Sequence, residues 1–349
     1  MSEPTISSDV FSMEEQPNLS TIMNVEHLKK YFPVQKSFLE RLFTRKMDYV
    51  KAVDDINFSI NKGEVFTLAG ESGCGKTTTG KLILGLIEPS GGKIVFEGTE
   101  IGKLKSEELR LLRRKIQMIF QDPYASLNPR MRIGTAVGHP LEIHGLARGE
   151  EKKKRVLEIL DKVGLTPPEQ FVGLYPHQLS GGQRQRVAMA RSIILGPEFI
   201  VADEPVSMID VSIRTTIIDL MLDLRKELGL TYLFITHDLA VAKYISDRIA
   251  IMYLGKIVEM GDKEEIFSHP LHPYAQALLS AVPVPTTERK RETIGLKGEV
   301  PSAIKIPQGC RFHPRCPIAT KECHEEEPSL SEKRPGHYVA CYHAGETIK

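Results

Sequence analysis

The chain has 349 residues, of which 46 are basic and 45 are acidic, so its formal net charge is +1. This balance argues against a general electrostatic affinity for nucleic acid, and the length suggests one large domain with an appendage, or two domains. The start of the chain lacks a basic segment followed by an apolar run, and no later stretch has the roughly 18 uncharged apolar residues that a membrane span needs. We therefore expect a soluble cytosolic chain whose polar, aperiodic residues 1–20 form a mobile tail.

Four short apolar runs rich in β-branched residues predict buried strands. They are Glu64–Ala69, Lys115–Phe120, Phe199–Ala202 and Thr231–Ile235. Helical stretches separate these runs, which favours an α/β domain with a largely parallel sheet, while the interval from about Leu127 to Leu195 has no convincing strand and predicts a helical subdomain. Beyond about Ile266 the chain becomes rich in proline, with one short helical segment at Tyr274–Ala281, so we expect an extended appendage there.

The segment GESGCGKT, directly after the first of these strands, fits the phosphate-loop pattern G-x-x-x-x-G-K-[ST] in full. In such a loop, glycines let backbone N–H groups turn toward phosphates, the lysine reaches the β and γ oxygens, and the threonine can ligate magnesium. A glycine-rich turn that binds nothing is the alternative, and the strand before it and the helix after it disfavour this. The residues predicted to bind the nucleotide are Gly70, Ser72, Gly73, Cys74, Gly75, Lys76, Thr77 and Thr78.

A second polar group follows the predicted strand at Phe199–Ala202. Asp203 can hold magnesium through water, and Glu204 is then free to polarise the water that attacks ATP. His237 ends the strand at Thr231–Ile235, at the edge of a parallel sheet where ligands usually bind. The alternatives are a solvated turn at residues 203–205 and a histidine that caps a helix.

The segment LSGGQ at Leu179–Gln183 predicts a second anion-binding helix start. Ser180 can cap the helix that follows, and Gly181 and Gly182 leave its N-terminus open. Gln183 completes the segment and is included among the expected nucleotide-binding residues. Since one nucleotide does not need two such sites, we expect these residues to grip the γ-phosphate of a nucleotide bound to another subunit.

Taken together, these motifs resemble the ATP-binding cassette (ABC) family over residues 21–265, in the family's order and at its usual separations. The resemblance implies a P-loop triphosphatase fold with a RecA-like parallel sheet core, an antiparallel β-lobe and a helical subdomain at about residues 122–195. It also implies that two cassettes sandwich two ATP molecules, each between the phosphate loop of one subunit and the LSGGQ segment of the other.

Three further roles follow from the same resemblance. Gln121, after the strand KIQMIF, would sense magnesium and the attacking water while contacting a membrane subunit, and His237 would hold the γ-phosphate. Asp210, in the segment SMID where the family more usually has SALD, would serve communication between subunits. Magnesium would then lie near Thr77, Gln121 and Asp203.

An aromatic residue upstream of the phosphate loop usually stacks on adenine in this family. The candidates are Tyr31, Phe32 and Tyr49, and Phe32 is the preferred one because of its place before the turn between two strands. The alternative is that these rings fill the core of the β-lobe.

Three classes of cassette protein are possible: a transporter motor, a DNA-repair or chromosome ATPase, and a translation-type ATPase. The chain lacks the long coiled coil of the second class and the two cassettes of the third. Residues 266–345, with HPLHPYAQALLSAVPVP and GCRFHPRCP, resemble the C-terminal region of oligopeptide/dipeptide importer ATPases, and other segments resemble their F-type member.

That resemblance implies a peripheral subunit on the cytoplasmic face of the membrane. Its partners would be a second, homologous ATPase in a heterodimer, two transmembrane permease subunits and, through the complex, an external solute-binding protein. Some family members move oligosaccharides, nickel or other small solutes, so peptide is one of several possible substrates.

Four of the five cysteines, Cys310, Cys316, Cys323 and Cys341, are spaced C-x5-C-x6-C-x17-C within residues 266–349. A proline-rich segment with little core needs a covalent or metal crosslink, and a reducing cytosol disfavours disulfides. Zinc sites usually have cysteine pairs that are closer in sequence, whereas these longer spacings allow four separate loops to converge on a metal centre larger than a single ion. The family resemblance implies a [4Fe–4S] cluster; zinc, free thiols and disulfides are the alternatives. A structural role is expected because ATP hydrolysis needs no electron transfer, and redox sensing is the alternative role.

Overall fold

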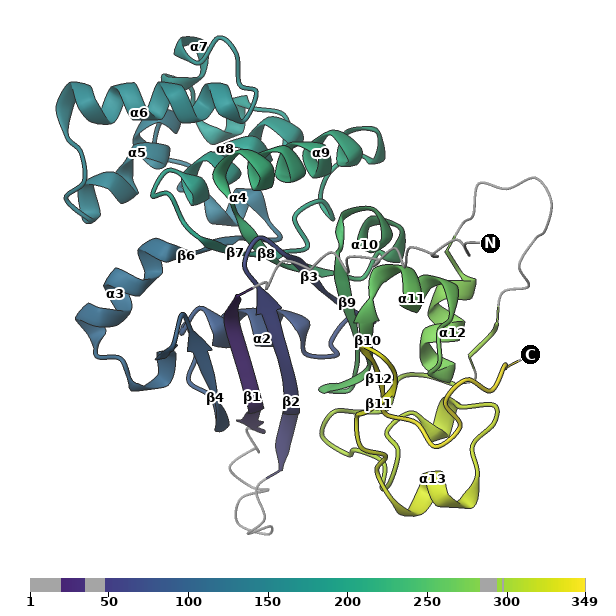
Figure 1. Ribbon diagram of the computed structural model, residues 1–349. Coiled ribbons are helices and arrows are strands. Elements are labelled where there is room, and N and C mark those ends of the chain that lie inside the picture. The colour runs from purple at the N-terminus through teal and green to yellow at the C-terminus, as the bar shows by residue number, and fades with distance from the viewer. Residues whose placement is uncertain (1–19, 35–47, 283–293, 297, 349) are drawn as a thin grey trace, which may run out of the picture.

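The computed structural model describes residues 20–34, 48–282, 294–296 and 298–348. The predicted tail therefore lies outside the described residues, apart from Ser20. An eight-stranded sheet runs through the molecule in the order β11-β12-β10-β9-β3-β8-β7-β6 (Figure 1). The strands of its central part are β3 (Val65–Ala69), β6 (Ile116–Ile119), β7 (Phe199–Asp203), β8 (Thr231–Thr236), β9 (Arg248–Tyr253) and β10 (Lys256–Asp262).

The four predicted strands are β3, β8, β7 and β6, which lie side by side in this sheet. All of them, together with β9, run parallel, and β10 pairs antiparallel with β9. Strands β3, β7 and β8 are buried along their whole length, which explains their continuous apolar sequences. Because parallel strands end at one edge, the polar residues that follow them meet there.

A second, antiparallel sheet forms the β-lobe, with strand order β2-β1-β4-β5. Its strands are β1 (Thr21–Pro33), β2 (Tyr49–Asn61), β4 (Gly91–Phe96) and β5 (Thr99–Glu100). One hydrophobic core joins the two sheets, and within it the rings of Phe58 on β2 and Phe66 on β3 stack with their centroids 5.1 Å apart. The expected cassette core and antiparallel lobe are thus confirmed.

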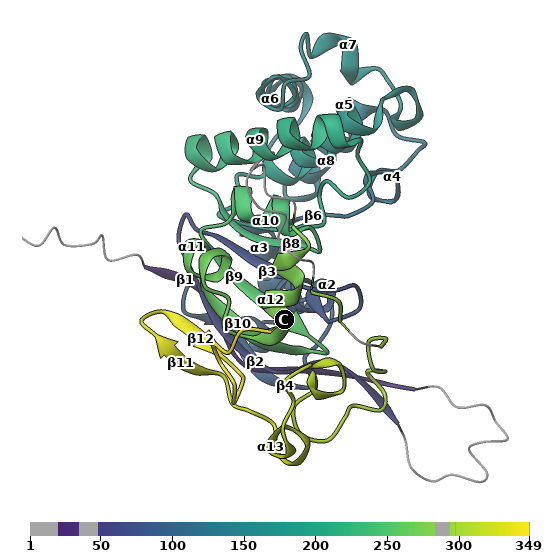
Figure 2. The same ribbon diagram turned by 90° about the vertical axis from the view of Figure 1, so that its right-hand side faces the viewer.

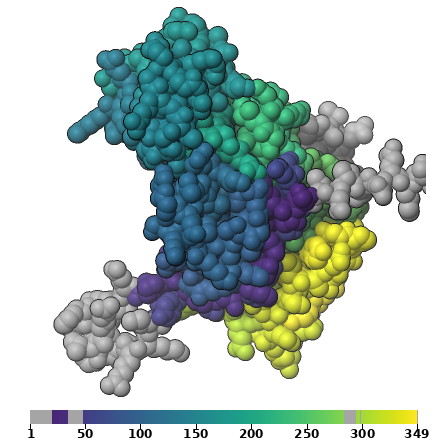
Figure 3. Space-filling model, turned by 60° about the vertical axis from the view of Figure 1, so that its left-hand side comes forward, coloured from purple at the N-terminus to yellow at the C-terminus, as the bar shows by residue number. Residues whose placement is uncertain are grey.

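Helices make up the part of the molecule at the top of Figure 1, and Figure 3 shows it as a mass distinct from the β-lobe below it. Between residues 120 and 198, all of which are described, there is no strand. Helix α5 packs against α6, α7 and α8 around a core that includes Val137, Leu160 and Val187. The helices from α2 to α10 are α2 (Lys76–Ile83), α3 (Ser106–Lys115), α4 (Pro123–Ser126), α5 (Ile133–Ile143), α6 (Gly149–Lys162), α7 (Glu169–Val172), α8 (Gly181–Ile193), α9 (Val211–Leu228) and α10 (Leu239–Ile245).

The C-terminal segment lies along the β10 edge of the main sheet (Figure 2). It contains α11 (Lys263–Ser268), α12 (Pro273–Ser280), α13 (Lys321–Glu325), β11 (Ser331–Arg334) and β12 (His337–Val339). The sequence predicted only α12, because the other elements are short and β11 is mostly exposed and charged. Strand β12 pairs with β10, and Phe312 packs with Tyr253 of β9 and Tyr274 of α12. The segment therefore shares a core with the sheet, where an extended appendage was expected.

A buried polar group fixes this attachment. The carboxylate of Glu259 on β10 accepts hydrogen bonds from the backbone N–H groups of Leu271 and His272, each at 2.8 Å. The ring of His337 on β12 lies 2.7 Å from the same carboxylate, and both side chains are fully buried. A buried carboxylate is stable only with several such donors, so this cluster specifies how the segment meets β10.

Candidate active site

A cavity of about 580 Å³ opens at the carboxyl ends of β3 and its neighbours. It is lined by Val50, Ala52, Gly70, Glu71, Ser72, Gly73, Gly75, Lys76, Thr77, Thr78, Gln121, Glu204, His237, Leu239 and Leu278. The structure thus brings most of the predicted phosphate loop together with Gln121, Glu204 and His237, which come from the ends of three other strands. Cys74 of the loop is buried and is not among these lining residues.

Two glycines set the path of the loop between β3 and α2. Gly70 and Gly75 have φ angles of +147° and +112°. A Cβ atom at Gly70 would lie 2.3 Å from the carbonyl oxygen of Met252, and one at Gly75 would lie 2.2 Å from that of Ala52. Because both contacts are with backbone, only glycine allows the loop to pass between β9 and β2.

The loop lysine and threonine have defined partners. The ammonium group of Lys76 is buried and donates hydrogen bonds to the carbonyl oxygens of Gly70 (2.7 Å) and Glu71 (3.0 Å). The hydroxyl of Thr77 donates to the carboxylate of Asp203 at 2.9 Å. Burial raises the pKa of Asp203, and the hydrogen bond from Thr77 opposes that rise. A divalent cation bound between these two side chains would favour the ionised carboxylate.

Glu204 lies between Gln121 and His237. Its carboxylate accepts a hydrogen bond from the amide of Gln121 at 2.9 Å and lies 3.0 Å from Nδ1 of His237. The residue has a φ angle of +45°, and its backbone N–H donates to Ile235 of β8. Asp238, rather than His237, caps helix α10, so the alternative of a capping histidine does not hold. The arrangement places a carboxylate and two polar side chains around one point of the cavity.

The LSGGQ segment lies apart from this cavity, since none of its described residues is among those that line it. Ser180 caps α8, its hydroxyl accepting from the N–H of Gln183 at 3.3 Å, and the side chain of Gln183 accepts from the N–H of Ser180 at 2.9 Å. Gly181 and Gly182 form the first turn of α8. Asp210 is exposed directly before α9. Ser180 and Asp210 are exposed and Gly182 is buried, and none of these residues lines the cavity beside the chain's own phosphate loop.

The aromatic candidates for adenine do not line the cavity. The hydroxyl of Tyr31 donates to Asp54, and Phe32 is partly exposed with the ammonium of Lys30 at 5.1 Å from its ring centroid. Tyr49 begins β2 and is also partly exposed. Val50 and Ala52 of β2 line the cavity instead, so the stacking role of Phe32 stays a prediction.

The C-terminal segment adds residues to the site that the sequence did not indicate. Leu278 of α12 lines the cavity, and the hydroxyl of Tyr274 accepts a hydrogen bond from the N–H of Glu71 at 3.1 Å. Arg315 makes two hydrogen bonds to the carboxylate of Glu71, at 2.8 and 3.1 Å. No local pattern in the sequence links residues this far apart.

The four C-terminal cysteines line one narrow cavity. They are not joined by disulfides, and the N–H of Cys310 donates to the carbonyl of Cys323 at 2.8 Å. Burial is the main cause that raises the pKa of Cys310 to about 11 and that of Cys341 to about 12, and neighbouring thiols add to it. Throughout the described ranges, however, no group of three or more His, Cys, Asp or Glu side chains is arranged to hold a metal ion. The structure supports convergence of the thiols and does not support a formed metal site.

Residues 53–207 match the ABC transporter family, and residues 258–323 match the oligopeptide/dipeptide transporter C-terminal region. The chain is 50% identical over 329 residues to the oligopeptide transport ATP-binding protein AppF of Bacillus subtilis, covering 93% of this chain and 98% of that protein. It is 47% identical over 322 residues to the dipeptide transport ATP-binding protein DppF of Haemophilus influenzae, covering 92% and 96%. A solved structure of the ATP-binding cassette MJ0796, dimeric and bound to ADP and Pi after hydrolysis, matches with a TM-score of 0.60 and 31% identity, covering 69% of this chain and 98% of that one.

Fold, site and relatives together define an ATP-hydrolysing protein of the ABC class, as the motifs predicted. Within that class, the chain belongs to the family of oligopeptide/dipeptide transporter ATP-binding proteins. None of the helices in its described part is both long and apolar enough to cross a membrane.

Proposed function

We propose that this chain is the motor subunit of an importer, hydrolysing ATP to drive the uptake of dipeptides or oligopeptides. The observation that carries the proposal is the joint presence of the Gln121–Glu204–His237 arrangement and a C-terminal region of the oligopeptide/dipeptide type. The names of the relatives support peptide as the substrate class. An importer of oligosaccharides, nickel or another small solute is the alternative, and an ABC ATPase outside transport is a weaker one.

The site residues have the following proposed roles. The backbone of the loop at Gly70–Thr78 and the ammonium of Lys76 would hold the phosphates, while Thr77, Asp203 and Gln121 would hold magnesium and its water. Glu204 takes a proton from the attacking water. The water oxygen bonds to the γ-phosphorus, and the bond from the γ-phosphorus to the oxygen that remains on ADP breaks. His237 lies beside Glu204 and stabilises the charge on the γ-phosphate. Phe32 is proposed to stack on adenine.

The active unit is proposed to be a heterodimer of two cassettes. Ser180, Gly181, Gly182 and Gln183 would close over the γ-phosphate of ATP on the partner ATPase, because they do not line the chain's own cavity. Asp210, exposed before α9, would contact the partner and link the two sites. The dimeric cassette among the similar structures supports this mode of assembly.

The remaining proposed partners are two permease subunits in the membrane and an external solute-binding protein that reaches the chain through them. The chain would then work on the cytoplasmic face of the cell membrane as a peripheral subunit. We propose the division into a cassette at 21–265, with its helical subdomain at about 122–195, and a C-terminal extension at 266–349.

A [4Fe–4S] cluster held by Cys310, Cys316, Cys323 and Cys341 is proposed for that extension. The support is that all four thiols line one cavity. A tetrahedral zinc ion would draw its thiolates to within about 4 Å of one another, whereas a polynuclear cluster is larger and keeps them further apart. When bound, the cluster would crosslink the C-terminal extension at these four cysteines. Zinc, or thiols without metal, are the alternatives.

Copurification from native membranes tests the main proposal. A tagged full-length chain should bring down two permease subunits and a second ATPase, and adding that ATPase to the isolated chain should raise ATP turnover well above that of either alone. Recovery with ribosomes or DNA-repair proteins instead would contradict the transport role. Full turnover by the chain alone at high dilution would contradict the heterodimer.

A further inference from the structure

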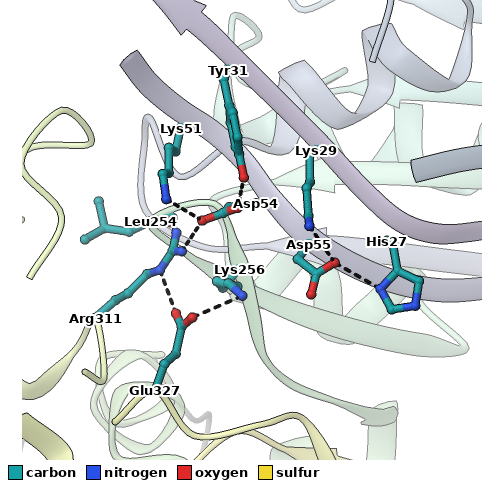
Figure 4. Close-up of polar contacts among 10 residues, drawn as sticks. All are labelled: His27, Lys29, Tyr31, Lys51, Asp54, Asp55, Leu254, Lys256, Arg311 and Glu327. Atoms are coloured by element: carbon teal, nitrogen blue, oxygen red, sulfur yellow. Dashed lines mark hydrogen bonds and ion pairs between the residues drawn. The ribbon is translucent and has the colours of Figure 1, made fainter. Parts of the chain in front are cut away.

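The segment between the first two C-terminal cysteines carries two arginines, Arg311 and Arg315, which are 6% and 8% exposed. Each of them reaches an acidic side chain outside the C-terminal segment. Arg311 pairs with Asp54 of β2 and with Glu327, and it donates to the carbonyl oxygen of Leu254 (Figure 4). Arg311 therefore attaches this segment to the β-lobe.

Arg315 reaches the phosphate loop itself. Its guanidinium donates two hydrogen bonds to the carboxylate of Glu71, at 2.8 and 3.1 Å, and lies 5.9 Å from the ring centroid of Tyr253. The fork of an arginine matches a carboxylate in this way in one orientation only, so the pair fixes the direction of the Glu71 side chain.

Three groups of Glu71 are held at once. Its carboxylate is bound by Arg315, its N–H donates to the hydroxyl of Tyr274, and its carbonyl oxygen accepts from the ammonium of Lys76. The first two partners belong to the C-terminal segment, and the third is the lysine that is proposed to bind phosphate. Any movement of Glu71 therefore changes the position of the loop backbone beside Lys76.

A largely buried ion pair contributes little net stability, because desolvation of both charges offsets their attraction. Its geometric effect remains, and here that effect falls on the residue next to Gly70, where the loop begins. We infer that Arg315 is a positioning residue for ATP binding: through Glu71 it holds the phosphate loop in the conformation that receives the phosphates. The cysteine-bearing segment is then a structural part of the nucleotide site. The inference rests on the proposed phosphate-binding role of residues 70–78.

Steady-state kinetics of the full-length chain in its transporter complex test this inference. Arg315→Met keeps an unbranched apolar stem and removes the guanidinium, and Glu71→Gln removes the charge from the other side. Both should raise the KM for ATP about tenfold and leave kcat within about twofold, because the loop binds the phosphates in the ground state and the transition state alike. Arg315→Lys should recover part of the loss, and the double variant should be no worse than either single variant.

Glu327→Gln is the matched control, because Glu327 also pairs with an arginine of this segment, and its partners Arg311 and Lys256 are not residues of the phosphate loop. It should leave the KM unchanged. An unchanged KM in Glu71→Gln and Arg315→Met, or an equal rise in Glu327→Gln, would overturn the inference. Lys76→Ala separates this failure from that of the proposed function: if it still binds ATP as tightly as the wild type, the loop assignment falls and the inference falls with it.

Discussion

In the proposed mechanism, the chemistry of the site depends on Glu204. Its carboxylate is fixed by Gln121 on one side and faces His237 on the other. The three residues follow β6, β7 and β8, so the sheet itself determines their separation. A base held in this way needs no reorganisation when water is bound beside it, which is the condition for efficient proton transfer.

Glu204→Gln should lower ATP turnover by on the order of a hundredfold or more while ATP still binds, because the amide keeps the size of the side chain and loses its basicity. Turnover and nucleotide binding are measured on the same preparation, and an ATP-bound dimer should accumulate. Lys76→Ala is the contrasting variant and should weaken ATP binding itself. Near-normal turnover in Glu204→Gln would assign the base to another group.

At the scale of elements, strand β2 joins the β-lobe to the C-terminal segment. Asp54 is 6% exposed and pairs with Arg311, and the hydroxyl of Tyr31 also donates to it. The next residue, Asp55, has a side chain that is 36% exposed and pairs with His27 and Lys29. Figure 4 shows the two carboxylates pointing to these different sets of partners. Asp54 thus anchors the C-terminal segment to β2, whereas the adjacent Asp55 makes only partly exposed pairs within the β-lobe.

Asp54→Asn should destabilise the protein by about 3 kcal/mol, because it leaves the buried guanidinium of Arg311 with one carboxylate fewer. Asp55→Asn, at the neighbouring position, should change stability by no more than about 0.5 kcal/mol, since exposed pairs contribute little. Thermal melting of the two variants measures the difference. Equal shifts in melting temperature would show that the Arg311 pair does not anchor the segment.

At the scale of the whole molecule, the C-terminal segment extends the main sheet at its β10 edge and contacts the β-lobe through Arg311 and Asp54. It also reaches the candidate site, because Leu278 lines the cavity and Tyr274 accepts a hydrogen bond from the backbone of Glu71. It also contains the cavity lined by four cysteines. A bound cluster would therefore stabilise a segment that contacts the phosphate loop.

Anaerobically purified protein should be brown and contain about four irons per chain. Cys323→Ser should lose this iron, whereas Cys74→Ser should keep it, because Cys74 lies in the phosphate loop. Iron and zinc are measured by elemental analysis, and removal of iron with a chelator should lower the melting temperature. Colourless protein with one zinc per chain would decide for zinc, and metal-free protein with an intact segment would reject the crosslink.

The sequence by itself determined the features whose signals are local. Lys76 was predicted from the phosphate-loop motif, and Asp203 and Glu204 from their place at the end of a strand that is fully buried and so has a continuous apolar sequence. Glycines at positions 70 and 75 were part of the motif, and the structure gives their reason in the backbone of Met252 and Ala52. The parallel core followed from the alternation of these runs with helices.

The tertiary structure alone decided which distant residues meet. Arg315 and Glu71 are 244 residues apart, and each is an ordinary charged residue in its own segment. Strands β11 and β12 have too few apolar residues to be recognised, and they form because β10 offers an unpaired edge. Periodicity and motifs report only what a residue's neighbours in sequence require, whereas an ion pair or an added strand depends on surfaces that exist only after the chain has folded.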